Sequence, residues 1–490
     1  MNWKDMWQLA KSDYLKLIPI MALAFYIAFI PHQGYPYPVH IDEWVHWAFS
    51  EAILKTGSTT STDPFLGQSI VGFGSPHLEV GYHLFWGTFH QISGVSWLTI
   101  FKYFPGVIFM ITVLSVYVLA QRHGFGWEAA FFTALIPTAV GVLGPGFLVP
   151  VAMGLLFIPL ALFLIFNFRS VWSYIVLFIF TCFLLSIHAP SAICVVIALM
   201  PYLLLNLKGN FKHSLGVGLA VIIPFLAPFP WIFDMLLPTA KALLIPQPLP
   251  TYIDFPRVVQ TYGYFPIAFC LLGTFLLVIK GGKENYGLVF GLLALLVMLV
   301  AFFTFHYGIS IMYERGLIFM MLMVGIVAGA GLAAVKNLSL PVKLTAWLKK
   351  PFIVQNIGRF LCLVFIGLTL AIGIPDRQDT PYYLMIDDED YQAFVWVREN
   401  VDEDYGKAVL DPWKATAFTA ITGRYIYTRT HAFPTPIDEE AARFLDGGCT
   451  DTTFLRENGI SIVYSQRGCQ NPDLTEVRKN VYLLKEPALP

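Results

Sequence analysis

Long apolar stretches separated by short polar segments dominate this chain. About eleven of them reach the roughly 17–25 residues that a helix needs to cross a bilayer. We predict membrane-spanning helices at 14–31, 102–121, 128–144, 147–167, 171–187, 190–207, 214–236, 264–280, 286–304, 316–335 and 359–375. The pattern therefore predicts a multi-span α-helical membrane protein with about eleven transmembrane helices.

The composition agrees with a membrane protein. Apolar residues make up 57% of the 490 residues and charged residues only 13%, and the mean hydropathy is +0.64. A soluble globular domain carries about 25% charged residues. The net charge is −1 and the sequence contains no basic stripe, so we expect membrane lipids as partners and no nucleic acid.

The positive charges predict an orientation in the membrane. Lys4, Lys11 and Lys16 lie at the start of the first apolar stretch, and no small-residue cleavage site follows it. We therefore expect a retained anchor with a cytoplasmic N-terminus. Alternating spans then place the loop 32–101 and everything after residue 375 on the exterior face of an integral plasma-membrane protein.

The composition changes at Pro375, where apolar stretches give way to a mixed sequence. Helical spacing over 388–400 and short buried strands at 408–410 and 460–464 predict a small exterior α/β domain over 376–490. Further helices are expected at 416–423, 439–445 and 452–458. Residues 1–375 would then form a transmembrane domain that includes the exterior loop.

Two cysteines, Cys449 and Cys469, lie in the predicted exterior domain. An oxidising exterior favours a disulfide between them. Spacing along the chain does not set the distance between the two side chains, so a bridge and two free thiols are both open.

A cluster of ionisable residues opens the exterior loop, in the stretch from Pro38 to Trp47 that reads PVHIDEWVHW. In a helix, Asp42 and Glu43 lie four and three residues before His46, so all three side chains share one face. The tryptophans beside them suit a helix over 42–55 that lies at the membrane interface. The acids are candidates for a catalytic or metal site, or for a cap at the helix start.

A second ionisable cluster follows in the same loop. Pro76 predicts the start of an apolar helix that runs to about residue 94. The helix brings in His77, Glu79 and His83, and the last two share a face because they are four residues apart. These side chains are either ligands for a substrate or a metal, or the hydrated face of a helix.

Two later motifs add candidates. His188 precedes Ala189-Pro190 between predicted spans, and Tyr313-Glu314-Arg315 precedes a Gly/Ala-rich span. A guanidinium group matches the geometry of a phosphate bidentately. Arg315 is therefore a candidate phosphate clamp, although an arginine at the end of a span also extends towards the headgroups without any catalytic role.

The order of these features resembles the C-type membrane glycosyltransferases, the GT-C superfamily that includes oligosaccharyltransferases and protein mannosyltransferases. The shared features are an N-terminal span, a loop that opens with Asp42-Glu43 and a histidine, two interfacial helices, many spans and an exterior α/β tail. The resemblance implies an inverting transfer of a sugar from a polyprenyl-phosphate carrier. It also implies that a carboxylate in the first exterior loop acts as general base or metal contact.

Transfer of this kind needs a base for the acceptor proton and positive charge for the leaving phosphate. We expect Asp42 to be the base, Glu43 to be the second choice and Arg315 to clamp the phosphate. Further substrate-binding candidates are His46, His77, Glu79, His83, His188, Tyr313 and Glu314. A divalent cation, Mg²⁺ or Mn²⁺, would be held by Asp42, Glu43, Glu79 and His83.

The acceptor is less well defined. The sequence lacks the W-W-D motif of protein oligosaccharyltransferases, which favours a simpler transfer to a lipid, glycan or protein acceptor. A lipid or glycolipid transporter or flippase is an alternative, because such proteins also combine many spans with intramembrane charge. A non-catalytic envelope assembly protein with a partner-binding tail is another.

Overall fold

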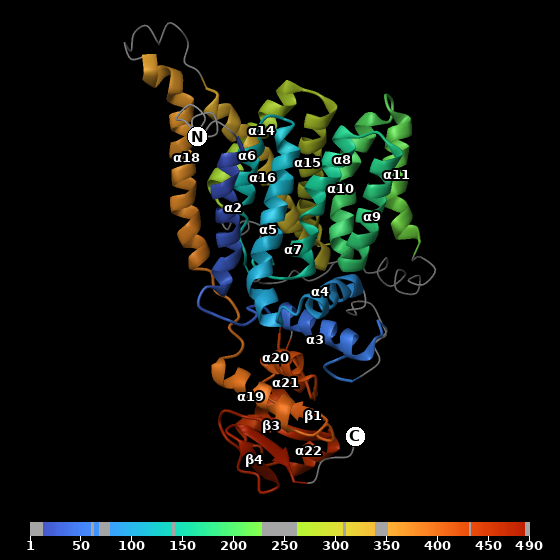
Figure 1. Ribbon diagram of the computed structural model, residues 1–490, viewed down its shortest axis with the longest axis vertical. Helices are drawn as coiled ribbons and strands as arrows, with labels where there is room; N and C mark the ends of the chain where they lie inside the picture. Colours follow the sequence, from blue (N-terminus) through green and yellow to red (C-terminus); the bar gives the residue numbers. More distant parts are fainter. Residues whose placement is uncertain are drawn as a thin grey trace. The chain divides into compact units, whose positions relative to one another are not determined.

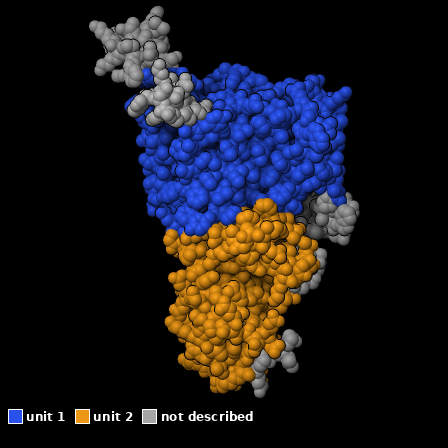
Figure 2. Space-filling model, viewed as in Figure 1, with its two compact units in different colours: residues 1–33, 103–381 blue, residues 34–102, 382–490 orange. Residues whose placement is uncertain are grey.

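The computed structural model describes residues 13–59, 63–67, 79–139, 143–227, 262–306, 310–338, 351–430 and 433–485, without the side chains of 13, 310–314 and 351–355. The chain forms two compact units (Figure 2). The first consists of residues 1–33 and 103–381, and the second of residues 34–102 and 382–490. Residues 34–102 thus fold with the C-terminal residues, whereas the sequence-based division at residue 375 groups the loop 32–101 with the spans.

Helices make up the described part of the first unit (Figure 1). In chain order they are α2 (Asp13–Phe29), η1 (Ile30–His32), α5 (Trp97–Gln121, which begins in the second unit), α6 (Gly126–Thr133), α7 (Pro150–Gly154), α8 (Phe157–Asn167), α9 (Val171–Ile187), α10 (Ala189–Asn206), α11 (Phe211–Leu226), α14 (Tyr264–Lys280), α15 (Lys283–Phe305), α16 (Ser310–Lys336) and α18 (Pro351–Gln378). Figure 1 shows most of them side by side in one bundle.

Seven helical segments of the described chain are long and apolar enough to cross a membrane: Tyr14–His32, Trp97–Gln121, Pro150–Asn167, Ala189–Asn206, Lys283–Phe305, Arg315–Lys336 and Asn356–Gln378. Three shorter apolar helices, α9, α11 and α14, also lie at predicted spans. Large apolar side chains such as Trp172, Leu271 and Phe360 are exposed on these helices, as expected of surfaces that face lipid. The mostly helical, multi-span prediction is confirmed, but the count of eleven spans is not.

The predicted span at 128–144 is wrong as a continuous helix. Helix α6 ends at Thr133, and residues 136–139 have no regular structure. Pro137 cannot donate a backbone hydrogen bond and disfavours helical geometry in the residue before it. Gly144 packs closely against Pro137, since a Cβ atom on Gly144 would lie only 2.1 Å from the carbonyl oxygen of Pro137.

Glycines allow the central helix α16 to pack closely against α14. A Cβ atom on Gly331 would lie 2.2 Å from the carbonyl oxygen of Phe269, and one on Gly273 would lie 2.1 Å from that of Val327. Side chains larger than hydrogen at these positions would therefore push the two backbones apart. Small residues at helix contacts are typical of membrane bundles, where backbones approach closely.

The second unit combines two loop helices with an α/β region. Its elements are α3 (Ile41–Thr56), α4 (Val80–Ser93), α19 (Asp388–Asn400), β1 (Lys407–Val409), α20 (Ala415–Thr422), β2 (Tyr425–Ile426), α21 (Pro436–Asp446), α22 (Thr452–Glu457), β3 (Ile460–Tyr464), β4 (Leu474–Arg478) and β5 (Val481–Leu484). The sheet has the order β2-β1-β3-β5-β4. β1 is parallel to β2 and β3, whereas β5 is antiparallel to β3 and β4. The helices and strands predicted over 388–464 are confirmed, within a few residues at their ends.

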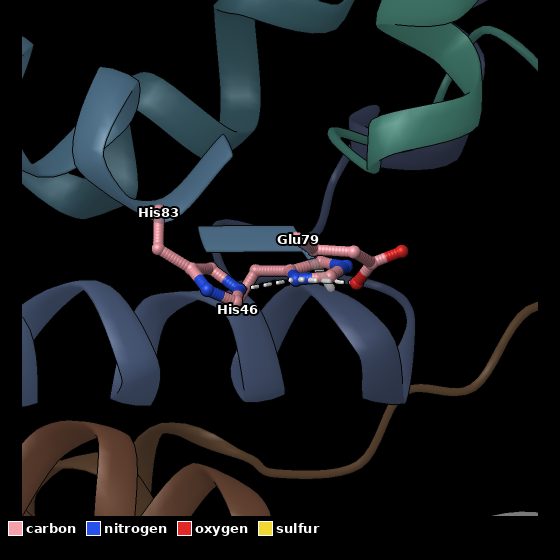
Figure 3. A group of neighbouring side chains, drawn as sticks. All are labelled: His46, Glu79 and His83. Carbon is pink, nitrogen blue, oxygen red and sulfur yellow. Dashed lines mark hydrogen bonds and ion pairs between the residues drawn. The ribbon is translucent and has the colours of Figure 1, made fainter. Parts of the chain in front are cut away.

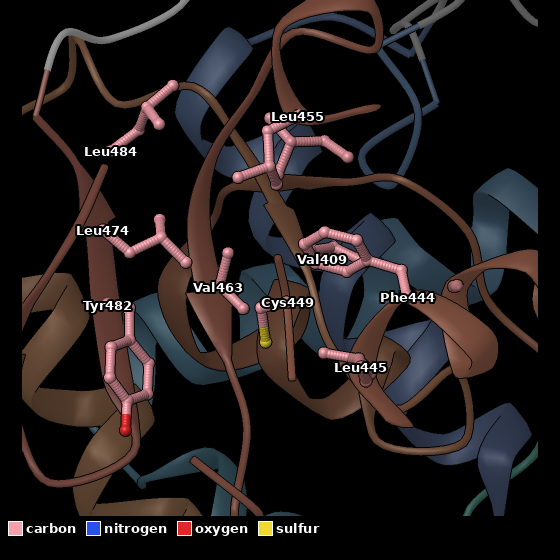
Figure 4. Close-up of a cluster of buried hydrophobic side chains, with 11 residues drawn as sticks. Val409, Phe444, Leu445, Cys449, Leu455, Val463, Leu474, Tyr482 and Leu484 are labelled. Carbon is pink, nitrogen blue, oxygen red and sulfur yellow. The ribbon is translucent and has the colours of Figure 1, made fainter. Parts of the chain in front are cut away.

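A buried cluster fills the space between the sheet and helices α21 and α22 (Figure 4). It includes Val409 and Val463 from adjacent strands, Phe444 from α21 and Leu455 from α22. Cys449 belongs to the same cluster and forms a disulfide with Cys469. The sequence left this pairing open, and the structure shows the bridge.

Direct contacts join the loop to the C-terminal residues within the second unit. Helix α20 packs against α3. The backbone amide of Ile426 in β2 donates a 2.7 Å hydrogen bond to the carbonyl oxygen of Phe65. Trp44 and Trp47 of α3 are buried and stack on each other, so both side chains pack within the protein.

Candidate functional site

Asp42 lies in the first turn of α3, and a histidine caps this helix. The Nδ1 atom of His40 accepts a 3.1 Å hydrogen bond from the backbone amide of Asp42. The Asp42 carboxylate lies 3.7 Å from the same nitrogen, and its side chain is 16% exposed. A carboxylate at a helix N-terminus is stabilised in its ionised form by the helix dipole. Asp42 is thus a charged group held in a defined place with partial access to solvent.

Glu43 has a different environment. Its Oε2 atom accepts hydrogen bonds from the backbone amides of Val39 (2.9 Å) and His40 (3.1 Å), which completes a capping box at the start of α3. The residue is fully buried. Glu43 therefore acts as a helix cap, as one interpretation of the sequence predicts: its carboxylate binds the backbone amides at the start of α3.

An arginine from the C-terminal residues enters the surroundings of Asp42. The guanidinium group of Arg429 lies 3.9 Å from the centre of the Phe65 ring. Burial lowers the pKa of Arg429, and the charges of Asp63 and Asp42 oppose this shift. Among the described residues, Nη1 of Arg429 is buried without a hydrogen-bond partner. No local motif marks Arg429, so the sequence did not reveal it.

Three predicted side chains meet between α3 and α4 (Figure 3). The Nδ1 atom of His46 lies 3.0 Å from Nε2 of His83 and 3.9 Å from Oε2 of Glu79. One ligand atom from each residue lies within 4.8 Å of the other two. The two histidines are buried, whereas the Glu79 side chain is 27% exposed. Glu79, the residue directly before α4, and His83, in the first turn of α4, thus both approach His46.

Aromatic rings surround this cluster. The Tyr82 ring meets the His46 ring edge-on at 4.9 Å, and Phe49 stacks on His83 at 5.3 Å. Burial raises the pKa of Tyr82 well above its ordinary value, and the charges of Glu43 and Glu79 add to the shift. Tyr82 is therefore a neutral phenol, and the histidines lie in a largely apolar setting.

His90 lies on the same helix, α4, but belongs to a different group. Its Nε2 atom is 3.9 Å from the Glu51 carboxylate, and its Nδ1 atom is 2.7 Å from the carbonyl oxygen of Val95. Its ring stacks on Trp97. His90 therefore also has a carboxylate and an aromatic ring beside it, but it lies outside the cluster of His46, Glu79 and His83.

The structure does not bring the whole predicted metal set together. Glu79 and His83 meet His46, while Asp42 and Glu43 lie outside this group because they belong to the cap of α3. Among the described residues, His46, Glu79 and His83 are the histidines, cysteines and acids that lie in a group of three close enough to hold a metal ion. Its donors are two nitrogens and one carboxylate oxygen.

His188 is buried and caps α10. Its Nδ1 atom lies 2.6 Å from Oγ of Ser191 and accepts a 3.2 Å hydrogen bond from the Ser191 amide. These contacts fix the start of the helix just before Pro190. A role in holding the helix start accounts for the geometry of His188.

Of the remaining predicted residues, the structure describes the side chain of Arg315 only. Arg315 is half-buried and begins the apolar span Arg315–Lys336. The side chains of Tyr313 and Glu314 lie outside the described residues, as does His77. His188 and Arg315 belong to the first unit, whereas Asp42, His46 and His83 belong to the second.

A separate cavity of about 420 Å³ lies in the first unit. It is lined by Arg122, His123, Arg169, Tyr202, Asn206, Lys280, Gly282, Lys283, Glu284 and Asn285. None of these is a predicted site residue. The cations come from loops that the sequence places on the cytoplasmic side, where an excess of Lys and Arg is typical of membrane proteins.

No protein-family model and no curated protein matches this chain by sequence. Its structure, however, is similar to solved structures of the oligosaccharyltransferase of Archaeoglobus fulgidus. The apo form has a TM-score of 0.59 and 12% identity, over 92% of this chain and 69% of that one. AglB of the same organism, in complex with an inhibitory peptide and a dolichol-phosphate, has a TM-score of 0.59 and 13% identity, over 95% and 70%.

A third structure, the complex of this oligosaccharyltransferase with Zn and sulfate, gives a TM-score of 0.56 and 11% identity, over 91% of this chain and 68% of that one. At such low identity the likeness concerns the fold. It extends over most of both chains. The resemblance that the sequence shows is thus confirmed at the level of the fold: this chain has a fold similar to that of the archaeal oligosaccharyltransferase.

Proposed function

We propose that this protein is a membrane glycosyltransferase that moves a sugar from a polyprenyl-phosphate carrier to an acceptor, with Asp42 as the general base. One observation carries the proposal. A partly exposed carboxylate opens the first helix after the first apolar span, in a chain with the fold of the archaeal oligosaccharyltransferase. The GT-C resemblance assigns the base or metal contact to a carboxylate at this position.

The proposed reaction is an inverting displacement. Asp42 takes the proton of the acceptor group while the acceptor atom attacks the anomeric carbon. The bond from this carbon to the phosphate oxygen breaks, and the lipid phosphate leaves with the electron pair. Positive charge near the phosphate lowers the barrier. Arg315 is the proposed clamp for the leaving phosphate.

Arg429 adds a second positive charge to this proposal. Burial lowers the pKa of its guanidinium, and the charges of Asp63 and Asp42 oppose this shift. It stacks on Phe65, so its orientation is restricted. We propose that Arg429 orients an anionic group of the donor or acceptor beside Asp42.

The dolichol-phosphate bound to the archaeal AglB supports a polyprenyl-type carrier for this chain. The acceptor is proposed to be a lipid, a glycan or a protein on the exterior face of the plasma membrane. His46, His77, Glu79, His83, His188, Tyr313 and Glu314 remain proposed substrate contacts, although the cap geometry of His188 favours a structural role.

The expected Mg²⁺ or Mn²⁺ fits the described residues poorly. These ions prefer a near-octahedral set of oxygens, but Glu43 is engaged with backbone amides and Glu79 lies with two histidines. We therefore assign no step of the reaction to a metal. The Zn and sulfate bound to the archaeal enzyme support a divalent cation for this fold in general.

The test is transfer of radiolabelled sugar from polyprenyl-phosphate donors to a membrane extract by the purified full-length protein. Asp42→Asn should reduce transfer at least about 100-fold, because general-base catalysis contributes about 10²–10⁴-fold. Glu403→Gln, which alters an exposed carboxylate of the same unit, should leave transfer unchanged.

Two results would overturn the proposal. One is full transfer by Asp42→Asn. The other is a folded wild type that transfers nothing from any donor and moves fluorescent glycolipid across vesicle membranes, which would establish the flippase alternative. Normal envelope assembly with Asp42→Asn and loss of assembly on deletion of 376–490 would instead favour a partner-binding protein.

A further inference from the structure

The side chains of His46, Glu79 and His83 converge although they come from two different helical segments. His46 lies in the middle of α3, Glu79 directly before α4 and His83 in the first turn of α4. Their nearest ligand atoms are separated by 3.0 Å and 3.9 Å, and all three lie within 4.8 Å of one another. Two ligand atoms of a tetrahedral Zn²⁺ ion, each about 2.0–2.1 Å from the metal, lie about 3.3 Å apart. The two histidine nitrogens are therefore already at this spacing, and the Glu79 carboxylate must move closer to them to complete such a set.

We propose that His46, Glu79 and His83 bind one Zn²⁺-type transition-metal ion, with a fourth position left for water or a substrate oxygen. Two imidazole nitrogens and one carboxylate oxygen form the ligand set of many open zinc sites. Mg²⁺ and Ca²⁺ favour oxygen ligands instead. The site is distinct from Asp42 and Glu43, which belong to the cap of α3.

Burial supports this assignment. His46 and His83 are 6% and 1% exposed, and aromatic rings pack on both. Imidazole is the commonest metal ligand among side chains, and burial with ring contacts on both histidines restricts the orientation of their nitrogens. Glu79, the most exposed of the three, adds a carboxylate oxygen at the edge of the cluster.

The ion would have a definite structural effect. His46 lies one helical turn after Asp42 on α3, while both other ligands belong to the start of α4. A metal bound by all three ligands fastens α4 to α3 and thereby fixes the helix that carries Asp42. Free energy gained by metal binding is then free energy of folding for these two helices.

A hydrogen bond between the two histidines is the alternative explanation of the 3.0 Å contact. In that case one ring donates to the other, and the cluster has no need of a metal. The two explanations differ in one measurable quantity, the number of metal ions that the protein binds tightly.

The experiment uses full-length protein in detergent, stripped with a chelator and then titrated with ZnSO₄ alone. Wild type should bind one Zn²⁺ per chain, measured by isothermal titration calorimetry and by metal analysis after gel filtration. Glu79→Gln and His83→Gln should each lower the affinity at least about tenfold, since loss of a ligand or its partner typically costs 10–100-fold. His90→Gln, on the same helix but outside the cluster, should bind as wild type does.

Two further measurements distinguish the loss of a metal ligand from misfolding of a variant. Zn²⁺ should raise the unfolding temperature of wild type and of His90→Gln but not that of His83→Gln, with helix content by circular dichroism equal in all three. Co²⁺ should give the visible absorption of a tetrahedral site in wild type and in His90→Gln, but not in His83→Gln. Absence of stoichiometric Zn²⁺ binding by wild type, or equal binding by folded His83→Gln, would overturn the proposal.

This inference stands apart from the proposed transfer reaction. Asp42→Asn should bind Zn²⁺ with wild-type affinity even if it transfers no sugar. A protein that binds Zn²⁺ but shows no transfer would refute the function and leave the metal site intact. Transfer that depends on Asp42 in a protein that binds no Zn²⁺ would refute the metal site and leave the proposed function intact.

Discussion

The hydroxyl group of Tyr35 makes two hydrogen bonds to the backbone of Ile386. It donates to the carbonyl oxygen at 2.7 Å and accepts from the amide at 3.2 Å. One side chain at the start of the loop 32–101 thus satisfies both polar groups of a residue 351 positions later in the chain. This contact fixes the beginning of the loop against the beginning of the C-terminal region.

Tyr35→Phe should therefore destabilise the second unit by about 1–3 kcal/mol, because it leaves two backbone groups without their partner. Chemical unfolding followed by tryptophan fluorescence would measure the change. Tyr425→Phe, which alters an exposed tyrosine of the same unit, is the control and should stay within about 0.5 kcal/mol of wild type. Equal stability of both variants would show that the Ile386 contact contributes nothing.

The same tyrosine predicts a dependence on alkaline pH. Burial raises the pKa of Tyr35 from 10 to about 12, so the folded state favours the protonated phenol. Its stabilising contribution is complete below pH 10 and is lost as the pH rises from 10 towards 12. Unfolding free energies measured between pH 9 and pH 11.5 should fall less steeply for Tyr35→Phe than for wild type.

Arg429 provides a prediction for activity. Arg429→Gln removes a restricted positive charge near Asp42 and should lower sugar transfer about tenfold or more, because charge in a water-poor site strongly stabilises a transition state. Arg467→Gln, which changes an exposed arginine paired with Asp446, should keep wild-type transfer. Unchanged transfer by folded Arg429→Gln would remove Arg429 from the proposed mechanism.

Helix packing in the first unit predicts a strong effect at one glycine. Gly331→Val places a branched side chain against the backbone of α14, where even a Cβ atom would lie 2.2 Å from the Phe269 carbonyl oxygen. Overpacking of this kind costs about 1–3 kcal/mol or more. Gly367→Ala, at a helical glycine with nothing within 4 Å, should be neutral or slightly stabilising. Detergent melting curves of the two variants would separate these outcomes.

The disulfide between Cys449 and Cys469 closes a loop of about 20 residues. Removing the bridge should cost about 3 kcal/mol through the greater freedom of the unfolded chain. Reduction with dithiothreitol should lower the unfolding temperature of the second unit in wild type but not in a Cys449→Ser/Cys469→Ser variant. If dithiothreitol lowered the unfolding temperature equally in both proteins, the change would not come from this disulfide.

Local signals in the sequence predicted much of this fold. Helix α19 follows from apolar spacing and begins with the capping residue Asp387, and β3 follows from a short apolar run. The sequence pattern does not predict strand β4, because it is a short edge strand whose middle residues, which include Thr475 and Glu476, are exposed. The span at 128–144 was predicted because hydropathy alone does not register the break at Pro137.

The candidate site also contains some residues that the sequence predicts and others that it does not. The spacing of Glu79 and His83 is local and was recognised, and His46 was marked by its place one turn after Asp42. The burial of Trp44 and Trp47 depends on aromatic partners in the fold, such as Trp97 and Phe101, and was not predicted. Arg429 approaches Asp42 only because residues far apart in the chain fold together, and spacing along the sequence carries no sign of this.

The discontinuous second unit has a consequence for synthesis. Its first portion, residues 34–102, leaves the ribosome before all of residues 103–381, and its second portion, 382–490, leaves last. Until then Phe65 lacks its β2 partner, and α3 lacks α20. A nascent or prematurely terminated chain therefore carries an unfinished unit on an otherwise inserted bundle. A chain that stops before residue 382 thus leaves residues 34–102 without the contacts that complete the second unit.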